Sequence, residues 1–504
     1  MTRQAGPLTR IALLGKGHEI WPVAAMLAQN LPPRIALVVI EDAGAPEESA
    51  ALTIPADHRF HHSLGIAVED LVLRCNGRVG LGSDCLGWHG EGSRFFAARS
   101  GMLPQINGVA LHHIMLRAAL MRDEPEKLAY LFQPFRFAAR AAMAGKLADP
   151  ADDAQSPLRL LGPTVQIDRA DYAALLKARC RAAGVEPREG RPVDVTREAD
   201  SGAIASVRLE DGEDVAADLF IDASGALAGL AGDDGAARFR PLSASLAFDR
   251  SITGPGADAG DTGHTAARAR AGGLLIETPL GEGRRAELLF SSAVMDEAAA
   301  QALVGGEAGS SPFAAGHAER PWTGNLVRIG GAAGRLGPYQ SADMLALYEQ
   351  ALQLVEWLPV STAMAIEARG YNRGQAEAIE EIRDFALLPF LLNGRSDAPW
   401  AAMREAAPPE SLQMRIDQFA GRGRFLAYEH AVFDEQSWID LLIGFGIIPR
   451  RCDPLARSLD MPRIATILRQ MVAAFTGAID AMPTQAEYRA DLIEGARAAG
   501  EGAG

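Results

Sequence analysis

Cysteine is scarce in this chain of 504 residues: only Cys75, Cys85, Cys180 and Cys452 occur, and none of them forms a CxxC pair. This scarcity argues against a disulfide framework and against a thiolate zinc site, so we expect no metal. Basic charge is also short, because 49 Lys and Arg stand against 64 Asp and Glu and leave a net charge of -15. An acidic surface repels phosphate backbones, so we expect no nucleic-acid partner.

Long apolar runs are missing near the start of the chain. The first apolar run, Ile11–Leu14, is too short for a signal peptide or a membrane span. We therefore expect a cytoplasmic protein that does not contact a membrane. Hydrophobic residues make up 48% of the chain and charged residues 22%, which is ordinary for a folded soluble protein. The length predicts two or more lobes, each with its own core.

The N-terminal residues show a strand, a glycine turn, a helix and a second strand in succession. The strands are continuous apolar runs, which predicts a parallel βαβ unit covered on both faces. These elements are expected at Arg10–Leu14, Gly15-Lys16-Gly17, Trp21–Asn30 and Arg34–Ile40, the last ending at Glu41. The spacing from the first glycine to Glu41 is that of a dinucleotide-binding unit.

Gly15 and Gly17 let the backbone approach a pyrophosphate at a helix N-terminus. Ile20 takes the place of the third glycine of GxGxxG, and Glu19 would repel a pyrophosphate. Glu41 stands where an acidic residue binds ribose hydroxyls. The alternatives are a glycine turn that binds no ligand and a solvated carboxylate at the end of a strand.

Two later buried strands also end in small residues. Ala217–Ala223 runs into Ser224-Gly225, and Asn325–Ile329 runs into Gly330-Gly331. Chains that bind a flavin return to it in this way from separate parts of the sequence, whereas a simple NAD domain needs only the first turn. The predicted cofactor-binding residues are therefore Gly15, Gly17, Glu41, Val193 in a β-ribbon over Gly190–Glu210, Asp222, Gly225, Gly330 and Gly331.

From about residue 10 to about residue 460, the chain resembles the flavin-dependent halogenases of the tryptophan halogenase family. The order and spacing of six stretches carry the resemblance: LTIPADHRFHHSLGI, NGVALHHIMLR, VQIDRADYAALL, DLFIDASG, VRIGGAAGRLGPYQS and YNRGQAEAIEEIRDF. The resemblance implies an α/β fold of the Rossmann-like, FAD/NAD(P)-binding flavin monooxygenase type. We expect this module over residues 1–355, with substrate-side insertions at about 84–165 and 235–320, and a mostly helical C-terminal substrate module over 356–504.

The resemblance also implies a chemistry. Family proteins use FAD reduced by a separate flavin reductase, together with oxygen and chloride or bromide. Hypohalous acid passes through a tunnel to a lysine and a glutamate, which direct halogenation of an aromatic or indole-like small molecule. Backbone at Ser341 and Ala342 matches the segment that holds the halide. Homodimers are common in the family, so a homodimer is expected as readily as a monomer.

Several departures from the family pattern concern this same chemistry. The lysine position holds Gly80 and the glutamate position holds Gln340. The WxWxIP motif is replaced by Leu274–Pro279, which keeps only its proline. Ala51 and Gly331 each replace an acidic residue of the family. Arg78 would share a strand face with position 80, but a permanently protonated guanidinium is no substitute for the lysine.

The leading hypothesis is an FAD-binding family member with altered oxidation chemistry. The alternative is a catalytically inactive member that acts as a binding or partner protein. A third reading, an active halogenase that uses other residues, is kept open, and a plain NAD dehydrogenase fits the later glycine turns poorly.

Three other features of the sequence are expected to have structural roles only. The adjacent His112 and His113 are expected to face different sides of a helix, one buried and one exposed. The charged run Glu377–Arg383 is expected to be a solvated helix face. Helices are also expected over Phe60–Leu73 and Leu103–Arg122.

Overall fold

A six-stranded sheet forms the base of the fold in the computed structural model, which describes residues 6–42, 50–99, 101–230, 238–256, 263–426 and 431–501. Five of its strands are parallel, and β20 is antiparallel to β21. The strand order is β20 (Trp322–Thr323), β21 (Leu326–Arg328), β12 (Leu219–Asp222), β1 (Arg10–Gly15), β2 (Ala36–Glu41) and β8 (Pro187–Glu189).

The predicted βαβ unit is present, with α1 (Gly17–Asn30) between β1 and β2. The apolar residues of β1 and of α1 share one core with α7 (Arg169–Ala182) and α11 (Ala342–Glu356). This packing of helices onto a parallel sheet explains why the strands are continuous apolar runs. The three strands β1, β12 and β21 lie side by side, so the three glycine turns that follow them meet at one edge of the sheet.

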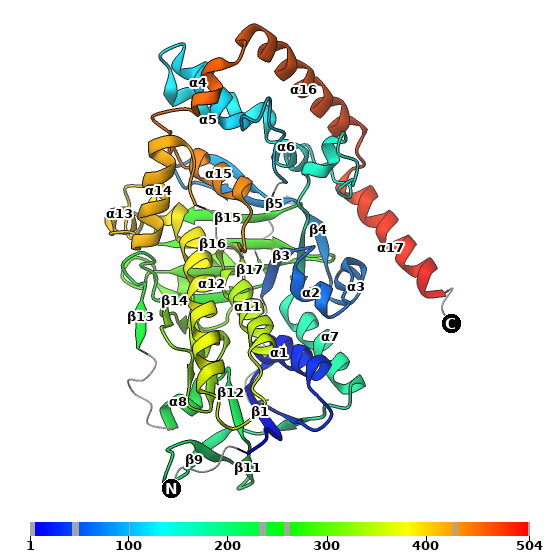
Figure 1. Cartoon of the computed structure of the whole chain (residues 1–504), viewed down its shortest axis with the longest axis vertical. Coiled ribbons are helices and arrows are strands. Elements are labelled where there is room, and N and C mark those ends of the chain that lie inside the picture. The colour runs from blue at the N-terminus through cyan, green and yellow to red at the C-terminus, as the bar shows by residue number, and fades with distance from the viewer. Residues whose placement is uncertain are drawn as a thin grey trace.

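A second, seven-stranded sheet lies above the first in Figure 1. Its order is β18 (Ser311–Pro312), β14 (Arg250–Gly254), β17 (Arg284–Phe290), β16 (Gly273–Pro279), β15 (Thr265–Arg270), β5 (Gly82–Leu86) and β6 (Arg94–Ala98). Three small sheets accompany the two large ones: β3 (Ala51–Pro55), β7 (Thr164–Asp168) and β4 (Arg78–Gly80); β13 (Phe239–Pro241), β19 (Gly316–Ala318) and β22 (Gly334–Arg335); β11 (Asp214–Ala216), β10 (Ile204–Leu209) and β9 (Pro192–Arg197).

The remaining helices fall into two groups. Those before α11 connect the strands: α2 (Arg59–Ser63), α3 (Val68–Arg74), α4 (Leu111–Leu120), α5 (Leu128–Phe132), α6 (Phe137–Met143), α8 (Ala226–Leu230), α9 (Glu297–Val304) and α10 (Gly330–Ala333). Those after α11 make the C-terminal part helical: α12 (Ala365–Leu391), α13 (Trp400–Glu405), α14 (Glu410–Arg422), α15 (Glu435–Gly444), α16 (Met461–Ala481) and α17 (Gln485–Glu501). Residues of this second group share a core with α4, α6, β5 and β6.

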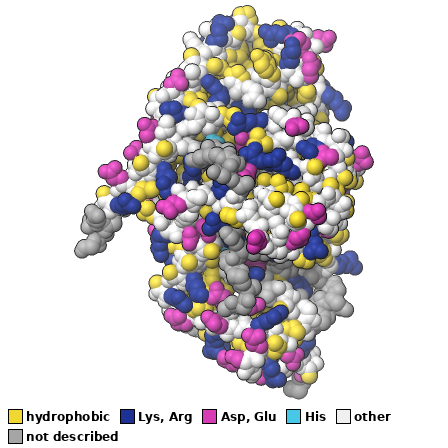
Figure 2. All heavy atoms as spheres, turned by 180° about the vertical axis from the view of Figure 1, so that it is seen from behind, with side chains coloured by type: hydrophobic (Ala, Val, Ile, Leu, Met, Phe, Trp, Pro, Cys, Tyr) yellow, Lys and Arg dark blue, Asp and Glu magenta, His cyan; other side chains and the backbone are white. Residues whose placement is uncertain are grey.

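The helix α16 lies along the edge of the molecule, and α17 projects from it (Figure 1). Within the described ranges, α16 alone has the length and mean hydropathy of a membrane-spanning helix, and 17% of the tested window is buried. Its buried Ile464, Phe475 and Ile479 join the same core as α6. On the face drawn in Figure 2, acidic and basic side chains are interspersed.

Two predicted helices are shorter than expected. Over Phe60–Leu73 the chain forms α2 and α3, separated at Gly65, whose φ of +60 ends the first helix. Over Leu103–Arg122 only Leu111–Leu120 is helical, because Ile106 and Val109 pair across a turn with positive φ at Asn107 and Gly108. Local composition favours a helix at both places, but residues with left-handed backbone conformation end or prevent the helix there.

The prediction for the adjacent histidines is wrong. His112 and His113 are 4% and 0% exposed, and their ring centroids lie 4.1 Å apart. His112 Nε2 donates to the carbonyl of Gly423 at 2.8 Å, and His113 Nδ1 accepts from the N–H of Asp453 at 3.2 Å. Segments more than 300 residues away cover both faces of α4.

The charged run on α12 is also only partly solvated. Glu381 and Arg383 are 2% and 7% exposed. The Glu381 carboxylate accepts from the N–H of Val432 at 2.8 Å, and Arg383 donates to Asp384 at 2.7 Å. The prediction of a solvated face is therefore wrong for these two residues, because a later segment of the chain packs on this part of α12.

Candidate functional site

The first glycine turn has the geometry of a dinucleotide-binding turn. Gly15 and Gly17 have φ of +151 and +45, and α1 begins at Gly17. Lys16, at the N-cap, makes no side-chain capping hydrogen bond. A Cβ on Gly15 would lie 2.5 Å from Cγ2 of Ile20 and 2.8 Å from Cβ of Ala223, so only glycine fits there. Ile20 thus fills the space that a third glycine would leave open.

Glu41 ends β2, next to this turn, and both of its carboxylate oxygens have partners within the protein. Oε1 accepts from Trp21 Nε1 at 3.0 Å, and Oε2 accepts from Lys177 Nζ at 2.5 Å. Lys177 Nζ also lies 5.3 Å from the centre of the Trp21 ring. Each carboxylate oxygen has a second lone pair, so the group retains capacity to accept from ribose hydroxyls. Val193 lies on β9 in a separate small sheet and is exposed.

Asp222 shapes the second glycine turn from inside. Its carboxylate is fully buried and accepts from the backbone N–H groups of Ser224, Gly225 and Leu227 at 2.9 to 3.0 Å. Burial raises the pKa of this carboxyl group, although these hydrogen bonds oppose the shift. Asp222 therefore fixes the conformation of the turn, and Gly225, with φ of +75, allows it.

The third turn has its backbone donors occupied by side chains of the protein itself. Gly330 N–H donates to Oε1 of Gln350 at 2.8 Å, and Gly331 N–H donates to Oε1 of Glu19 at 3.2 Å. Arg335 Nη2 lies 3.8 Å from the same Glu19 oxygen. Glu19 thus connects the first glycine turn to the third, across the edge of the sheet where the predicted cofactor phosphates would lie.

The turn before α11 carries the positions predicted to bind halide and to replace the glutamate. Gln340 and Ser341 both have left-handed backbone, with φ of +56 and +50. Ser341 N–H donates to the carbonyl of Pro338 at 2.9 Å, and Ala342 N–H donates to that of Tyr339. The Ser341 hydroxyl accepts from the N–H of Thr53 at 3.0 Å. Both predicted halide donors are therefore engaged within the turn.

Gly80 lies on β4, opposite Thr164 of β7. A Cβ at position 80 would lie 2.6 Å from Nε2 of Gln166, so the carboxamide of Gln166 fills the space where a side chain would begin. Gln166 is fully buried, and neither polar atom of its side chain has a hydrogen-bond partner; the Thr164 hydroxyl is also buried and unpaired. Arg78 lies opposite Gln166 in the same ladder.

Three neighbouring cavities, which share lining residues, lie between the glycine turns and an aromatic-lined interior. The first, the flavin-side cavity of about 80 Å³, is lined by Lys16, Glu19, Gly331, Arg335 and Ser341 among others. A passage of about 20 Å³ shares Ala51, Glu287, Pro338 and Ser341 with it. The third, the aromatic cavity of about 50 Å³, shares Thr53, Ser83 and Gln340 with the passage. Gln340 therefore stands between the passage and the aromatic cavity.

Phenylalanine rings and a buried ion pair surround the aromatic cavity. Phe95, Phe385 and Phe433 line it, and the Phe385 and Phe433 rings stack with their centroids 3.8 Å apart. Asp440, also in its wall, accepts from Arg136 Nη2 at 2.6 Å, and Arg136 lies 4.3 Å above the Phe95 ring. The cavity wall thus combines apolar ring faces with side chains of Asp440, Thr164 and Gln340.

Several of these residues carried no signal in the sequence. Gln166, Gln350 and the Arg136–Asp440 pair are brought to the site by contacts between distant parts of the chain. The conflict between Glu19 and a pyrophosphate was visible in the sequence, but its bond to Gly331 was not. Among the described residues, no group of three or more His, Cys, Asp or Glu is arranged to hold a metal ion.

Comparisons with known proteins agree on one family. A family model described as tryptophan halogenase matches residues 10–461. The tryptophan 7-halogenase KtzQ of Kutzneria sp. (strain 744) is 26% identical, over 88% of this chain and 90% of its own length. The tryptophan 6-halogenase ThaL of Streptomyces albogriseolus is 25% identical, over 87% of this chain and 90% of its own length. The solved structure of BrvH, a flavin-dependent halogenase from Brevundimonas sp. BAL3, is 27% identical, with a TM-score of 0.85 over 96% of this chain and 99% of that one.

Proposed function

The chain belongs to the tryptophan halogenase family, and we propose that it is an FAD-dependent oxidoreductase that oxidises an aromatic small molecule without halogenating it. One observation carries the proposal: three neighbouring cavities that share lining residues extend from the glycine turns to an aromatic cavity, while positions 80 and 340 hold glycine and glutamine. These cavities are suited to a route from cofactor to substrate, and positions 80 and 340 lack the lysine and glutamate that would direct a halogen.

The first glycine turn supports FAD binding. The N-terminus of α1, with glycine on both sides of Lys16, is suited to hold a pyrophosphate, and Glu41 lies where it would meet the adenosine ribose. At the third turn, FAD would displace the Glu19 carboxylate from Gly331. Reduced FAD, when bound, would supply the two electrons needed to place one oxygen atom of dioxygen on the aromatic ring and to release the other as water.

The residues of this chain would position the substrate and exclude water. Phe95, Phe385 and Phe433 offer apolar faces to an aromatic ring, and Gln340 can hydrogen-bond a polar substituent at the mouth of the passage. Neither glycine nor glutamine accepts a proton or holds a positive charge near neutral pH. A halogenated ring intermediate, if it formed, would therefore meet no charged side chain at position 80 or 340.

A second candidate function is that of a catalytically inactive binding or partner protein. Its support is that Glu19 and Gln350 occupy the two N–H groups of Gly330 and Gly331. A protein that never binds FAD would satisfy its own backbone donors in this way, because buried N–H groups without partners are costly.

The biological setting follows from the family. We propose a soluble cytoplasmic protein that receives reduced FAD from a separate flavin reductase, and an indole-like or other aromatic substrate. Relatives described as tryptophan halogenases support this substrate class. Whether chloride or bromide binds is to be tested with the protein. We propose that the protein forms a homodimer, which a measurement of its mass in solution tests.

Two measurements decide between these functions. The first is a titration of the purified protein with oxidised FAD, followed by flavin absorbance and fluorescence; saturable binding supports the oxidoreductase, and no binding at high micromolar FAD supports the inactive protein. The second incubates the protein with a flavin reductase, NADH, oxygen, bromide and a panel of indoles and phenols, with mass spectrometry of the products. Oxygenated products are expected, and brominated products would show that Gly80 and Gln340 do not disable halogenation.

A further inference from the structure

A groove of about 470 Å³ lies between the edge strand β6, the helix α6 and the end of α16. β6 contributes Arg94 and Phe96 to its lining, α6 contributes Arg140 and Met143, and α16 contributes Ile479. Figure 1 shows α16 running above α6. The volume lies within the range of small-molecule pockets. No step of the proposed function uses this groove.

Basic side chains outnumber acidic ones in the described lining of the groove. Arg94, Arg136 and Arg140 line it, and Asp480 is the acidic residue among them. Such an excess stands out in a chain whose net charge is -15. Asp480 is exposed, so solvent weakens its effect on the arginines. The groove is therefore a local region of positive charge on an acidic protein.

Two of these arginines have carboxylate partners that lie outside the groove. Arg94 Nε donates to Asp84 Oδ1 at 2.9 Å, and Arg136 Nη2 donates to Asp440 Oδ2 at 2.6 Å. Both carboxylates are buried, and neither lines the groove. Arg136 is buried as well, whereas the Arg94 side chain is 48% exposed and its Nη1 takes no part in the contact with Asp84. Arg94 can therefore contact a ligand in the groove.

Arg140 has no carboxylate partner among the described residues. Its Nη1 donates to the carbonyl of Pro134 at 2.9 Å, and its Nη2 donates to the hydroxyl of Thr476 at 2.8 Å. These bonds hold the guanidinium between α6 and α16 but leave its charge without a counterion. Each terminal nitrogen carries two N–H groups, so Arg140 retains donors. A carboxylate matches such donors in geometry and in charge.

Apolar side chains form much of the wall beside these arginines. Phe96 and Ile479 are buried, whereas Met143 is 48% exposed. An exposed methionine has a flexible, polarisable side chain that can pack against ligands of different shapes. A bare inorganic anion would use the arginines and leave this wall in water. The groove is therefore better suited to an anion that carries an apolar group.

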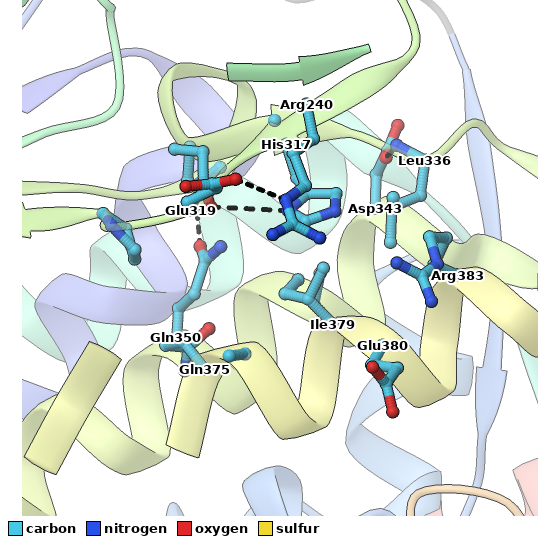
Figure 3. A pocket seen from close by; sticks show the side chains of 17 residues that line it. Arg240, His317, Glu319, Leu336, Asp343, Gln350, Gln375, Ile379, Glu380 and Arg383 are labelled. Atoms are coloured by element: carbon cyan, nitrogen blue, oxygen red, sulfur yellow. Dashed lines mark hydrogen bonds and ion pairs between the residues drawn. The ribbon is translucent and has the colours of Figure 1, made fainter. Parts of the chain in front are cut away.

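The flavin-side cavity and the cavity drawn in Figure 3 show no such excess in their described linings. The second of these, of about 260 Å³, is lined by Arg240 and Arg383 and by three carboxylates, Glu319, Asp343 and Glu380. Figure 3 shows Arg240 bonded to Glu319. In the flavin-side cavity, basic and acidic side chains are equal in number. The charge of the groove beside β6 thus favours an anion more than that of either cavity.

We propose that this groove binds a small organic anion, with its carboxylate at Arg94 and Arg140 and its apolar group against Met143. The carboxylate supplies the counterion that Arg140 lacks, and the apolar group leaves water. The site does not depend on the proposed function. Phe95 lines both the groove and the aromatic cavity, so the experiment has to distinguish binding at these two places.

The probe is 2-naphthoate, a flat aromatic carboxylate. Its matched control is 2-naphthamide, which keeps the two rings and has no charge. Isothermal titration calorimetry measures the binding of each compound to the full chain. We expect 2-naphthoate to bind at least about tenfold more tightly than the amide, and added NaCl to weaken the binding of the carboxylate alone. Inorganic phosphate is expected to bind at least about tenfold more weakly than 2-naphthoate, because it buries no apolar surface.

Variants locate the binding to the groove. Arg140→Met removes the charge and keeps an unbranched side chain, so the affinity for 2-naphthoate is expected to fall about tenfold. The control is Arg122→Met, at an exposed arginine that also donates to a backbone carbonyl and does not line the groove. Phe433→Leu changes the aromatic cavity but not the groove. Neither Arg122→Met nor Phe433→Leu is expected to alter the affinity.

Charge changes at Met143 keep the test decisive if Arg140→Met unfolds. Met143→Glu is expected to weaken 2-naphthoate binding and Met143→Lys to strengthen it, and the exposure of this position lets both variants fold.

Four results would overturn the proposal. They are no binding of 2-naphthoate, equal binding of the amide or of phosphate, equal affinity in the two Met143 variants, and unchanged affinity in a folded Arg140→Met, whether or not Phe433→Leu weakens binding. The titrations are repeated with FAD present, and failure of FAD to bind would count against the proposed function while leaving the 2-naphthoate result unaffected.

Discussion

The carboxylate of Glu19 accepts a hydrogen bond from the backbone N–H of Gly331 over 3.2 Å, and so joins two turns that are 312 residues apart in sequence. The bond lies where a dinucleotide cofactor would meet both turns. It opposes an anionic ligand in two ways, by occupying a donor and by placing a negative charge beside the phosphates. This relationship gives the most direct test of cofactor affinity.

Replacement of Glu19 by glutamine is expected to strengthen FAD binding. The substitution removes the negative charge beside the phosphates and leaves Gly331 N–H bonded only to a neutral amide oxygen, which a phosphate can displace more easily, so the Kd for FAD should fall about tenfold, the equivalent of about 1.4 kcal/mol. Fluorescence titration measures it. The control is Glu356→Gln at an exposed position at the end of α11. Unchanged affinity in Glu19→Gln would show that Glu19 does not compete with the cofactor.

Replacement of Glu41 by glutamine is expected to weaken the binding of FAD but not the binding of FMN. Glu41 is held by Trp21 and Lys177 at the place predicted for the adenosine ribose. FMN has no adenosine, so Glu41→Gln should weaken FAD binding about tenfold or more and leave FMN binding unaltered, given about 1.5–3 kcal/mol for a hydrogen bond to a charged group. Equal losses for the two flavins would place Glu41 outside the ribose site.

A lysine at position 80 is expected to destabilise the fold unless Gln166 is changed as well. The Gly80→Lys side chain would meet Gln166 at its first carbon and would overpack a buried strand, which costs about 1–3 kcal/mol. Combining it with Gln166→Ala should recover most of that loss, because space is made and an unpaired amide is removed. Urea unfolding compares the two variants.

The matched control for that experiment is Gly229→Lys on α8, where an added Cβ meets nothing within 4 Å. It should unfold at nearly the wild-type urea concentration. If Gly80→Lys is as stable as this control, then Gln166 moves aside freely, and packing does not require a glycine at position 80.

Acid is expected to destabilise the fold through buried histidines such as His61. Burial, with a smaller contribution from His58, lowers the pKa of His61 from 6.5 to about 3. The folded ring stays neutral while the unfolded ring takes up a proton below pH 6.5, so its stabilising contribution is complete above pH 6.5 and falls as the pH decreases toward 3. At pH 5 the loss amounts to about 2 kcal/mol.

The variant His61→Gln retains a hydrogen-bonding group toward Tyr172 and removes this titration. Its free energy of unfolding should therefore depend less on pH between 6.5 and 5 than that of the wild type. His62→Gln, at the adjacent exposed position, is the control. If the free energies of unfolding of wild type and His61→Gln change equally with pH, His61 is not the source of the acid destabilisation.

Sequence patterns predicted the parts of the fold that depend on local order. The βαβ unit from β1 to β2 follows from apolar runs and a glycine turn, and the structure has it. Burial of His113 and Glu381 was not predictable, because segments far along the chain cover them. The same reason applies to the site, where Gln166 and Gln350 reach their positions through long-range packing alone.

The roles of the individual cofactor residues stay predictions. The structure places Gly15, Gly225, Gly330 and Gly331 at turns that meet at one sheet edge. Motif spacing predicted where these glycines lie. It contained no information about Gln350, which occupies the N–H group of Gly330 from a later helix.

The consecutive left-handed residues Gln340 and Ser341 have a consequence for how the passage responds to ligands. Left-handed backbone costs a residue other than glycine about 1–2 kcal/mol, so this wall between the passage and the aromatic cavity is held away from its relaxed conformation by its neighbours, among them Thr53. A molecule that entered from either end and loosened those contacts would gain part of that energy. The conformation of this wall is therefore set by its neighbours and not by the backbone preference of its own residues.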